Sequence, residues 1–394
     1  MMKDVRVKKV EGNDALLTSE AEWQTLFAVS DCSPFLSWEW LNVWLESFGD
    51  GKSPMLLKAY RGDALIAILP MFREKKRLAA MRFDRVALLG EGVGGADHLD
   101  IISRPEDRAA AMTAIFDYIN ISESADVLCL ENLDNGSVTT ELLRDLSLRA
   151  GLRFNRFSSS ISAVCPQIDL AEGWAAVLAN SKREDNFRRK LKKLEKMPGF
   201  EFRSVTSPNE TGDAFERFLH LHQKRWEKEG GSELSGHPRL ISFQRSLVSK
   251  LSCKGLIRFD ELWKGGECLS SIYGLDSGKT FYYYNSGYDQ DFSKLSVGLV
   301  LLGLSVKSAI ERGVTLYDFL RGDEAYKSDW ANCRTELVNF RFSRPKLAVI
   351  VSERVGNALG GLKDALKSKL PVGLTERVAN RRRSLNRKYQ LSGR

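Results

Sequence analysis

The stretch YYYNSGYDQDFSKLSVGLVLLGL, residues 282–304, decides the fold that the sequence predicts. Its aromatic start favours a β-strand that ends near Ser286-Gly287; a polar loop follows, and Lys294–Gly298 opens a long apolar helix. The first N–H groups of a helix have no partner inside it, and together with the helix dipole they attract anions. The pattern therefore predicts an anion site at this helix start. Spacing alone leaves open an ordinary capped helix, with Ser293 or Ser296 as the N-cap.

A second polar cluster follows one helix later, in TLYDFLRGDEAYKSDW, residues 315–330. A strand–helix–strand crossover brings the exit of this second strand to the same sheet edge as the helix start. A carboxylate at that place can accept a proton from a nucleophile, and a tyrosine can return one to a leaving group. The stretch is therefore a candidate acid–base site.

The alternative for the same stretch is a solvated loop with an Asp-capped turn. Asp323 and Glu324 fit that interpretation well. Asp318 fits it poorly because it lies inside an apolar run, where a buried acid needs a partner. Arg321 and Lys327 are the natural partners in the sequence.

The wider chain repeats one order of elements: helix pair, hairpin, strand, loop, helix, strand. The hairpin turns are Arg61-Gly62-Asp63 in the first half and Lys264-Gly265-Gly266 in the second. An internal duplication of an α+β unit is the economical explanation. We expect one domain at 1–170, a second that carries the active site at 171–345, and a basic tail at 346–394.

Length and composition narrow the class of protein. A chain of 394 residues is too long for one ordinary core. No apolar run approaches the ~18 residues of a membrane span, and the charged N-terminus is unlike a signal peptide, so we expect a cytoplasmic protein. From Lys346 to Arg394 there are 12 Lys and Arg against 3 Asp and Glu, so most of the net charge of +8 belongs to the tail. The six cysteines form no CxxC pair, and we expect no metal.

A third candidate lies in HLHQKRW, where His222, Arg225 and Trp226 recur at helical spacing. A single His on a helix is more often structural than catalytic. The chain has no nucleophile elbow, P-loop or dinucleotide fingerprint, and the GEGVGG stretch near residue 90 reads as a loop.

The segment SKREDNFRRKLKKLEK, residues 181–196, has eight basic and three acidic residues. Phe187, Leu191 and Leu194 form one stripe, which predicts a solvated helix docked by these three side chains. The alternatives are a basic surface for RNA, for anionic lipid or for an acidic substrate.

The motifs HxxRW, YNSGYDQDFSKLSVG and DFLRGDEAYKSDW resemble the second half of the cellulose-biosynthesis (CelD/BcsL-type) acetyltransferases. That family belongs to the GNAT superfamily and is related to the FemAB-type aminoacyl transferases. The resemblance extends from about residue 20 to 345 and is most specific between 220 and 330. It implies an α/β (mixed α+β) fold of tandem GNAT-like domains, each a mixed central sheet flanked by helices. It also implies an acyl-CoA donor with its pantetheine in a split between strands and its pyrophosphate on a helix start.

Carried over position by position, the resemblance implies three groups of residues. They are catalytic Asp318, Asp323, Tyr326 and Lys327; cofactor-binding Ser286, Lys294, Ser296, Val297 and Gly298; and substrate-binding His222, Arg225, Trp226, Tyr284 and Arg321. Our hypothesis is that Asp318 or Asp323 assists deprotonation of the acceptor. Tyr326, or a tyrosine within 283–288, would then protonate the thiolate.

These expectations combine into an acyltransferase that moves an acyl group, acetyl in the first instance, from acyl-CoA to an amine or hydroxyl. The setting that the resemblance implies is cell-envelope or exopolysaccharide biosynthesis. The partners are acetyl-CoA or another acyl-CoA, a small-molecule or glycan acceptor, and an anionic membrane contacted by the tail; we expect no specific DNA binding. Two alternatives stay open: a non-catalytic GNAT-fold scaffold of a polysaccharide machinery, and a FemAB-like transferase with an aminoacyl-tRNA donor.

Overall fold

The computed structural model describes residues 5–78, 81–227, 233–322 and 324–351. Asp323 and residues 352–394, which hold most of the predicted tail, lie outside the described residues. The chain forms two compact units. Among the described residues, unit 1 comprises 5–166, 320–322, 324 and 333–351, and unit 2 comprises 167–227, 233–319 and 325–332. No helix in these ranges is long and apolar enough to cross a membrane.

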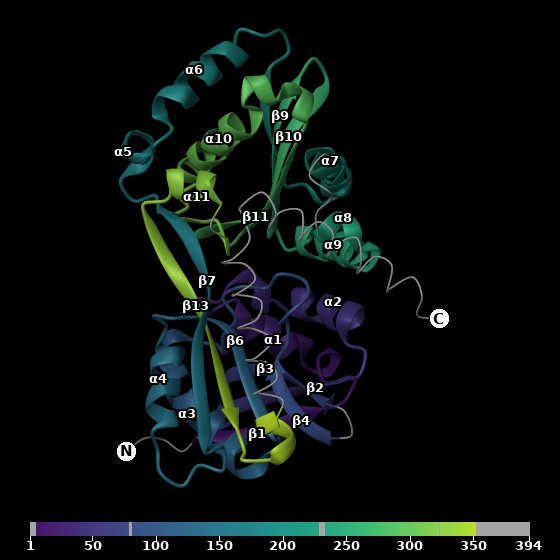
Figure 1. The fold of residues 1–394 in the computed structure, drawn as a ribbon, viewed down its shortest axis with the longest axis vertical. Helices are drawn as coiled ribbons and strands as arrows, with labels where there is room; N and C mark the ends of the chain where they lie inside the picture. The colour runs from purple at the N-terminus through teal and green to yellow at the C-terminus, as the bar shows by residue number, and fades with distance from the viewer. Residues whose placement is uncertain (1–4, 79–80, 228–232, 323, 352–394) are drawn as a thin grey trace. The chain divides into compact units, whose positions relative to one another are not determined.

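Unit 1 is a mixed sheet covered by helices (Figure 1). Its elements are β1 (Val5–Glu11), η1 (Leu17–Ser19), α1 (Glu20–Phe27), η2 (Pro34–Leu36), α2 (Trp38–Phe48), β2 (Lys52–Arg61), β3 (Ala64–Leu78), β4 (Met81–Leu88), β5 (Ile102–Ser103), α3 (Pro105–Ser122), β6 (Val127–Asp134), α4 (Val138–Ser147), the first part of β7 (Arg156–Asp169) and β13 (Cys333–Ser343). The strands lie in the order β1-β2-β3-β4-β6-β13-β7, with β5 beside β3. The pair β4–β6 is parallel.

Unit 2 repeats this architecture. Its elements are the end of β7, α5 (Gly173–Asn180), α6 (Glu184–Leu194), β8 (Glu201–Val205), α7 (Pro208–Glu227), α8 (Glu233–Gly236), α9 (Pro238–Ser252), β9 (Ile257–Lys264), β10 (Glu267–Asp276), β11 (Thr280–Tyr288), η3 (Gln290–Leu295), α10 (Val297–Glu311), β12 (Leu316–Asp318) and α11 (Ala325–Trp330). The strand order is β7-β12-β11-β10-β9-β8, with β11 and β12 parallel. In Figure 1, α10 lies on one face of this sheet and α7 with α9 on the other.

The mixed α/β fold class predicted from the sequence is confirmed, and both predicted hairpins form at Gly62 and Gly265. In each unit a strand precedes a group of helices, three strands that pair in a row, a helix and a further strand; unit 1 adds the short β5, and unit 2 the short α8. The closing strands differ from the expected division at 170/171. β7, from the first half, pairs with β12, whereas β13, expected in the second domain, pairs with β6 in unit 1.

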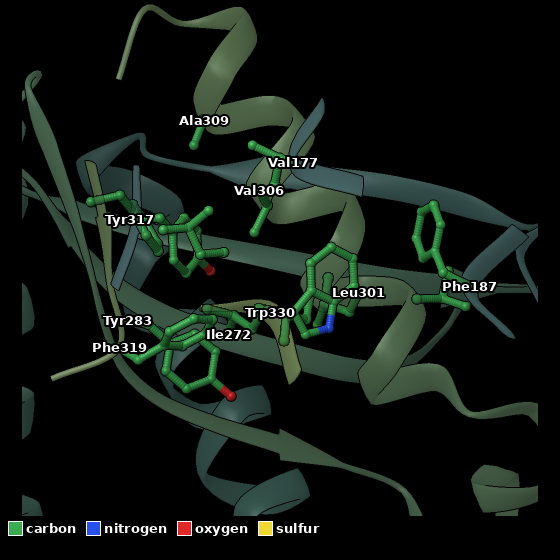
Figure 2. Packing of buried hydrophobic residues seen from close by; sticks show 14 of the residues in the cluster. Val177, Phe187, Ile272, Tyr283, Leu301, Val306, Ala309, Tyr317, Phe319 and Trp330 are labelled. Atoms are coloured by element: carbon green, nitrogen blue, oxygen red, sulfur yellow. The ribbon is translucent and has the colours of Figure 1, made fainter. Parts of the chain in front are cut away.

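The core of unit 2 forms around α10, which is apolar on nearly all sides and therefore needs cover all round. Leu301 and Val306 pack against the sheet side chains Ile272 and Tyr317 (Figure 2). On the outer side, Phe187 of α6 lies directly against Gly303. A Cβ at Gly303 would stand 2.3 Å from the Phe187 ring, so glycine is required for this contact.

Candidate active site

Strands β11 and β12 run side by side only briefly. Their parallel pairing covers Thr280–Tyr282 against Leu316–Asp318, while β11 continues to Tyr288 with β10 as its partner. The two strands therefore part after Tyr282 and Asp318. A cavity of about 330 Å³ lies on the α10 side of this sheet. It is lined by Arg183, Asn186, Arg225, Ser270, Ile272, Tyr283, Ser286, Tyr288, Ser293, Ser296, Val297, Gly298, Leu299, Leu302, Tyr326 and Trp330.

The start of α10 forms part of the cavity wall, as the sequence pattern predicts for an anion site. Ser296 joins η3 to α10 in the left-handed conformation, with φ 55°, which costs a non-glycine residue roughly 1 kcal/mol or more. Its side chain makes no capping hydrogen bond. The first turn, Val297–Leu299, contains no acidic residue and lines the cavity. The alternative of a helix capped by the Ser296 hydroxyl is therefore wrong.

The end of α7 holds β11 at this point. The buried His222 donates from Nδ1 to the Ser286 carbonyl oxygen at 3.0 Å, and Arg225 donates from Nη1 to the Ser286 hydroxyl at 3.0 Å. Burial lowers the pKa of His222, and the neighbouring Arg225 charge lowers it further. Gly287 permits the approach, because a Cβ there would lie 2.4 Å from the His222 backbone nitrogen. His222 is thus a supporting residue and does not line the cavity.

Arg225 brings positive charge to the cavity wall. Its guanidinium lies 5.2 Å from the centre of the Tyr288 ring and 5.3 Å from that of Trp226. Gly298 faces the other part of Tyr288, with a Cβ position 3.5 Å from the ring. Arg225 has no carboxylate partner among the described residues. The α10 start and this cation therefore both lie beside the Tyr288 ring.

The residues predicted to be catalytic are placed unequally. Tyr326 lines the cavity and contacts Tyr283, with ring centres 6.3 Å apart. Asp318 is buried at the end of β12, outside the lining, and accepts a hydrogen bond from Gln167 Nε2 at 2.6 Å. Lys327 is also buried outside the lining.

The other predicted residues are placed as follows. Asp323 lies outside the described residues. Ser286, Ser296, Val297, Gly298 and Arg225 line the cavity, whereas Lys294 and Trp226 stand beside it. The Tyr284 hydroxyl accepts a hydrogen bond from Gln244 of α9 at 2.7 Å, on the α7–α9 side of the sheet. Arg321 belongs to unit 1, where its Nε donates to Asp97 at 2.6 Å.

Sequence reasoning missed the contribution of the start of α6 and of the residue before it. Arg183 and Asn186 line the cavity, and Arg183 Nε donates to Asp329 of α11 at 2.6 Å. The basic composition of this segment was its only signal. Trp330, which the resemblance includes in the strand exit without a role, lines the cavity with its ring packed against Phe187.

Comparisons with known proteins agree with this architecture. Residues 181–328 match the family model described as Acetyltransferase (GNAT) domain. The crystal structure of FemX superposes with a TM-score of 0.58 at 12% identity, covering 82% of this chain and 96% of FemX. The structure of L-PGS from Bacillus licheniformis has a TM-score of 0.52 at 10% identity, covering 84% of this chain and 94% of that one.

A conserved protein of unknown function from Bacteroides thetaiotaomicron has a TM-score of 0.51 at 12% identity, covering 82% of this chain and 97% of its own. No curated protein matches the sequence. At these identities the structural matches establish the fold alone. The chain therefore has a GNAT-type fold, shared with FemX over four fifths of its length, and its residues 181–328 match the GNAT acetyltransferase model.

Proposed function

We propose that unit 2 is an acyltransferase that uses acyl-CoA as donor and an amine or hydroxyl as acceptor. The observation that carries this proposal is the cavity at the parting of β11 and β12, with the uncapped start of α10 in its wall. The GNAT family match of residues 181–328 supports it, because GNAT domains generally use acyl-CoA.

The α10 start would hold the phosphates of the donor. The unpaired N–H groups of its first turn and the positive end of the helix dipole suit an anion. Arg225 and the exposed Lys294 add charge on either side. Beyond Tyr282, the backbone of β11 has left β12 and is free of that strand, so it can hydrogen bond to an extended pantetheine arm.

The reaction would be a direct transfer. The acceptor nitrogen or oxygen bonds to the thioester carbonyl carbon, the C–S bond breaks, and the acceptor proton passes to a base. Tyr326 would donate its proton to the departing thiolate, since it lines the cavity, and such help accelerates reactions roughly 10²–10⁴-fold. We propose that the buried Asp318 positions the end of β12, and that Asp323 stays a candidate base.

The acceptor class follows from resemblance alone. Similarity to the CelD/BcsL-type acetyltransferases supports a role in exopolysaccharide or cell-envelope synthesis in the cytoplasm, with acetyl-CoA as the donor to test first.

Calorimetry of the full chain with acetyl-CoA tests the donor. We expect a one-site isotherm, and release of free thiol when an acceptor is added from a panel of amino sugars and amines. The Tyr326→Phe variant should bind acetyl-CoA normally and lose thiol release by at least about tenfold. Absence of binding would instead favour the scaffold or the aminoacyl-tRNA-dependent alternative.

A further inference from the structure

Helix α6 carries an exposed band of positive charge that the proposed acyl transfer does not use. Its apolar stripe faces inward, with Phe187 and Leu194 buried against unit 2, as the sequence pattern predicts. The side chains on the opposite side are exposed. We call the following five the basic face: Arg188, Arg189, Lys192 and Lys193 of α6, and Lys196, which lies two residues past the helix end.

Most of this charge is not neutralised within the protein. Arg188 forms an ion pair with Glu184 at 2.8 Å. Lys192, Lys193 and Lys196 have no acidic partner in the part of the chain that the structure describes. Positive charges also face one another four residues apart, at Arg188 and Lys192 and again one residue later, and such pairs destabilise a helix.

Packing holds the helix in place despite this repulsion. Phe187 lies against Gly303 of α10, and its ring also meets Trp330 edge-on with centres 6.0 Å apart. Figure 1 shows α6 along the outer side of α10. The cations are therefore presented on a fixed convex surface, where an anionic surface would relieve their repulsion.

The basic face begins at the wall of the cavity. Arg183 and Asn186, just before it, line the cavity. Lys190, on the same helix, donates from Nζ to the backbone oxygen of Lys294 at 2.6 Å, beside the start of α10. A partner lying along α6 would consequently stand next to the cavity and the start of α10.

We propose that the basic face binds the surface of an anionic lipid bilayer and holds the cavity beside it. A flat, negatively charged surface can meet a convex helix along its whole length, and clusters of several Lys and Arg on an amphipathic helix are attracted to anionic lipids. The large apolar side chains that the described part exposes do not include one on α6, so the contact is electrostatic without insertion.

Two further features favour a bilayer over RNA. Single-stranded RNA binding relies on exposed aromatic side chains between the cations, and α6 exposes none. The sequence from Lys346 to Arg394 adds 12 Lys and Arg against 3 Asp and Glu. Stable attachment to a membrane surface usually needs two signals, and a basic segment of this kind supplies a second.

Co-sedimentation of the full chain with lipid vesicles tests the proposal. We expect binding to phosphatidylcholine vesicles containing about a third phosphatidylglycerol, weakening with salt, and none to pure phosphatidylcholine. Each lysine near such a surface contributes about fivefold to partition, so the triple variant K192A/K193A/K196A should bind roughly a hundredfold less.

The matched control K254A/K279A/K307A removes the same charge from exposed positions elsewhere in unit 2, and should bind within about threefold of the wild type. Lys192, Lys193 and Lys196 are exposed and have no acidic partner among the described residues. The triple variant K192A/K193A/K196A should therefore fold with an unchanged or slightly higher melting temperature and bind acetyl-CoA normally. Equal loss in both triple variants, or equal binding to neutral vesicles, would overturn the proposal. The proposal would also be overturned if the protein bound RNA through Lys192, Lys193 and Lys196 and did not bind vesicles.

Discussion

Both units contain a pair of parallel strands joined through a helix, β4–α3–β6 in unit 1 and β11–α10–β12 in unit 2, but their helix starts differ. α3 begins with Pro105, which lacks an N–H, and has Glu106 and Asp107 in its first turn. α10 has no acid in its first turn, Val297–Leu299. The protein's own carboxylates lie at the positive end of the helix dipole in unit 1, whereas the first turn of α10 in unit 2, where we propose that a ligand binds, has none.

The two units also differ in whether an arginine of this region is paired with carboxylates. In unit 1, Arg85 is the first β4 residue of the parallel pairing with β6, and Glu91 and Glu74 hold its guanidinium, with Nη2 to Glu91 Oε2 at 2.7 Å. In unit 2, Arg225 reaches the cavity with no carboxylate partner in the described ranges. The same arrangement of strands and helix therefore contains an arginine paired with carboxylates in unit 1, Arg85, and an arginine without a carboxylate partner among the described residues in unit 2, Arg225.

Breaking the charge cluster of unit 1 should give the largest effect. Arg85→Met leaves the buried Glu91 without its cation and leaves Glu74 with Lys76 alone, which costs about 3–5 kcal/mol in the free energy of unfolding. Acetyl-CoA affinity should be unchanged. Chemical denaturation and calorimetry measure the two quantities.

The matched variant is Arg225→Met, which should weaken donor binding and change the stability little. Its guanidinium has a hydroxyl and aromatic rings for neighbours, so unfolding should change by about 1 kcal/mol. Donor affinity should fall by roughly tenfold. If Arg85→Met weakened the donor more than Arg225→Met, the assignment of the two sites would be reversed.

Giving α10 the acidic start of α3 should come next in size. Gly298→Asp places a carboxylate where the phosphates are proposed to bind, and repulsion should weaken acetyl-CoA about a hundredfold. A Cβ fits there at 3.5 Å from Tyr288, and an acid at a helix start stabilises the helix by about 0.3–1 kcal/mol.

Gly298→Ala controls for the added side chain and should bind within about threefold of wild type. In Gly298→Asp we therefore expect weaker acetyl-CoA binding together with higher stability, both relative to the wild type. Equal affinity in the two variants would show that the helix start does not hold the anion.

Features of the fold and site that depend on neighbouring residues could be predicted from the sequence, whereas those that depend on residues far apart in the chain could not. Strand β11 and helix α10 follow from local aromatic and apolar runs, and Ser296 and Gly298 were placed correctly at the helix start. The edge strands β1 and β8 were missed because their alternation is mixed with charge, as in VRVKKVE. β12 has only three residues, since the strands part where the apolar run continues.

The contacts that build the cavity wall are tertiary and left little local signal. The bond from His222 to Ser286 joins residues 64 apart in the chain. Arg183 reaches the cavity because Asp329 holds it, across 146 residues. The basic composition of this segment predicts a solvated helix but not its position in the fold. The packing of Phe187 against Gly303 fixes α6 on α10, with the first turn of α6 at the cavity.

A smaller effect separates two serines at helix starts. Ser137 of unit 1 caps α4, accepting from the Thr140 N–H at 3.2 Å, so Ser137→Ala should cost about 1 kcal/mol. Ser296 makes no such bond, and Ser296→Ala should change stability by less than about 0.5 kcal/mol. Ser296→Gly should raise the melting temperature by relieving the positive φ. A larger loss from Ser296→Ala than from Ser137→Ala would mean that the Ser296 hydroxyl does cap α10.

The smallest effect is the contribution of one unit 2 residue, His222, to the pH dependence of stability. Burial lowers the pKa of His222, so the unfolded chain, where histidine has its ordinary pKa of about 6.5, binds this proton more readily than the folded one. Stability is therefore full above that value and is lost as pH falls through it, with a slope of less than one proton. His222→Gln can still donate to the Ser286 carbonyl and should remove this slope, whereas the exposed His220→Gln should leave it intact. Unfolding measured between about pH 7.5 and 5.5 compares the three proteins. Because Glu91 and Asp100 of unit 1 also titrate in this range, the His222 contribution is the difference in slope between His222→Gln and the wild type. An identical slope in the two proteins would show that His222 does not contribute.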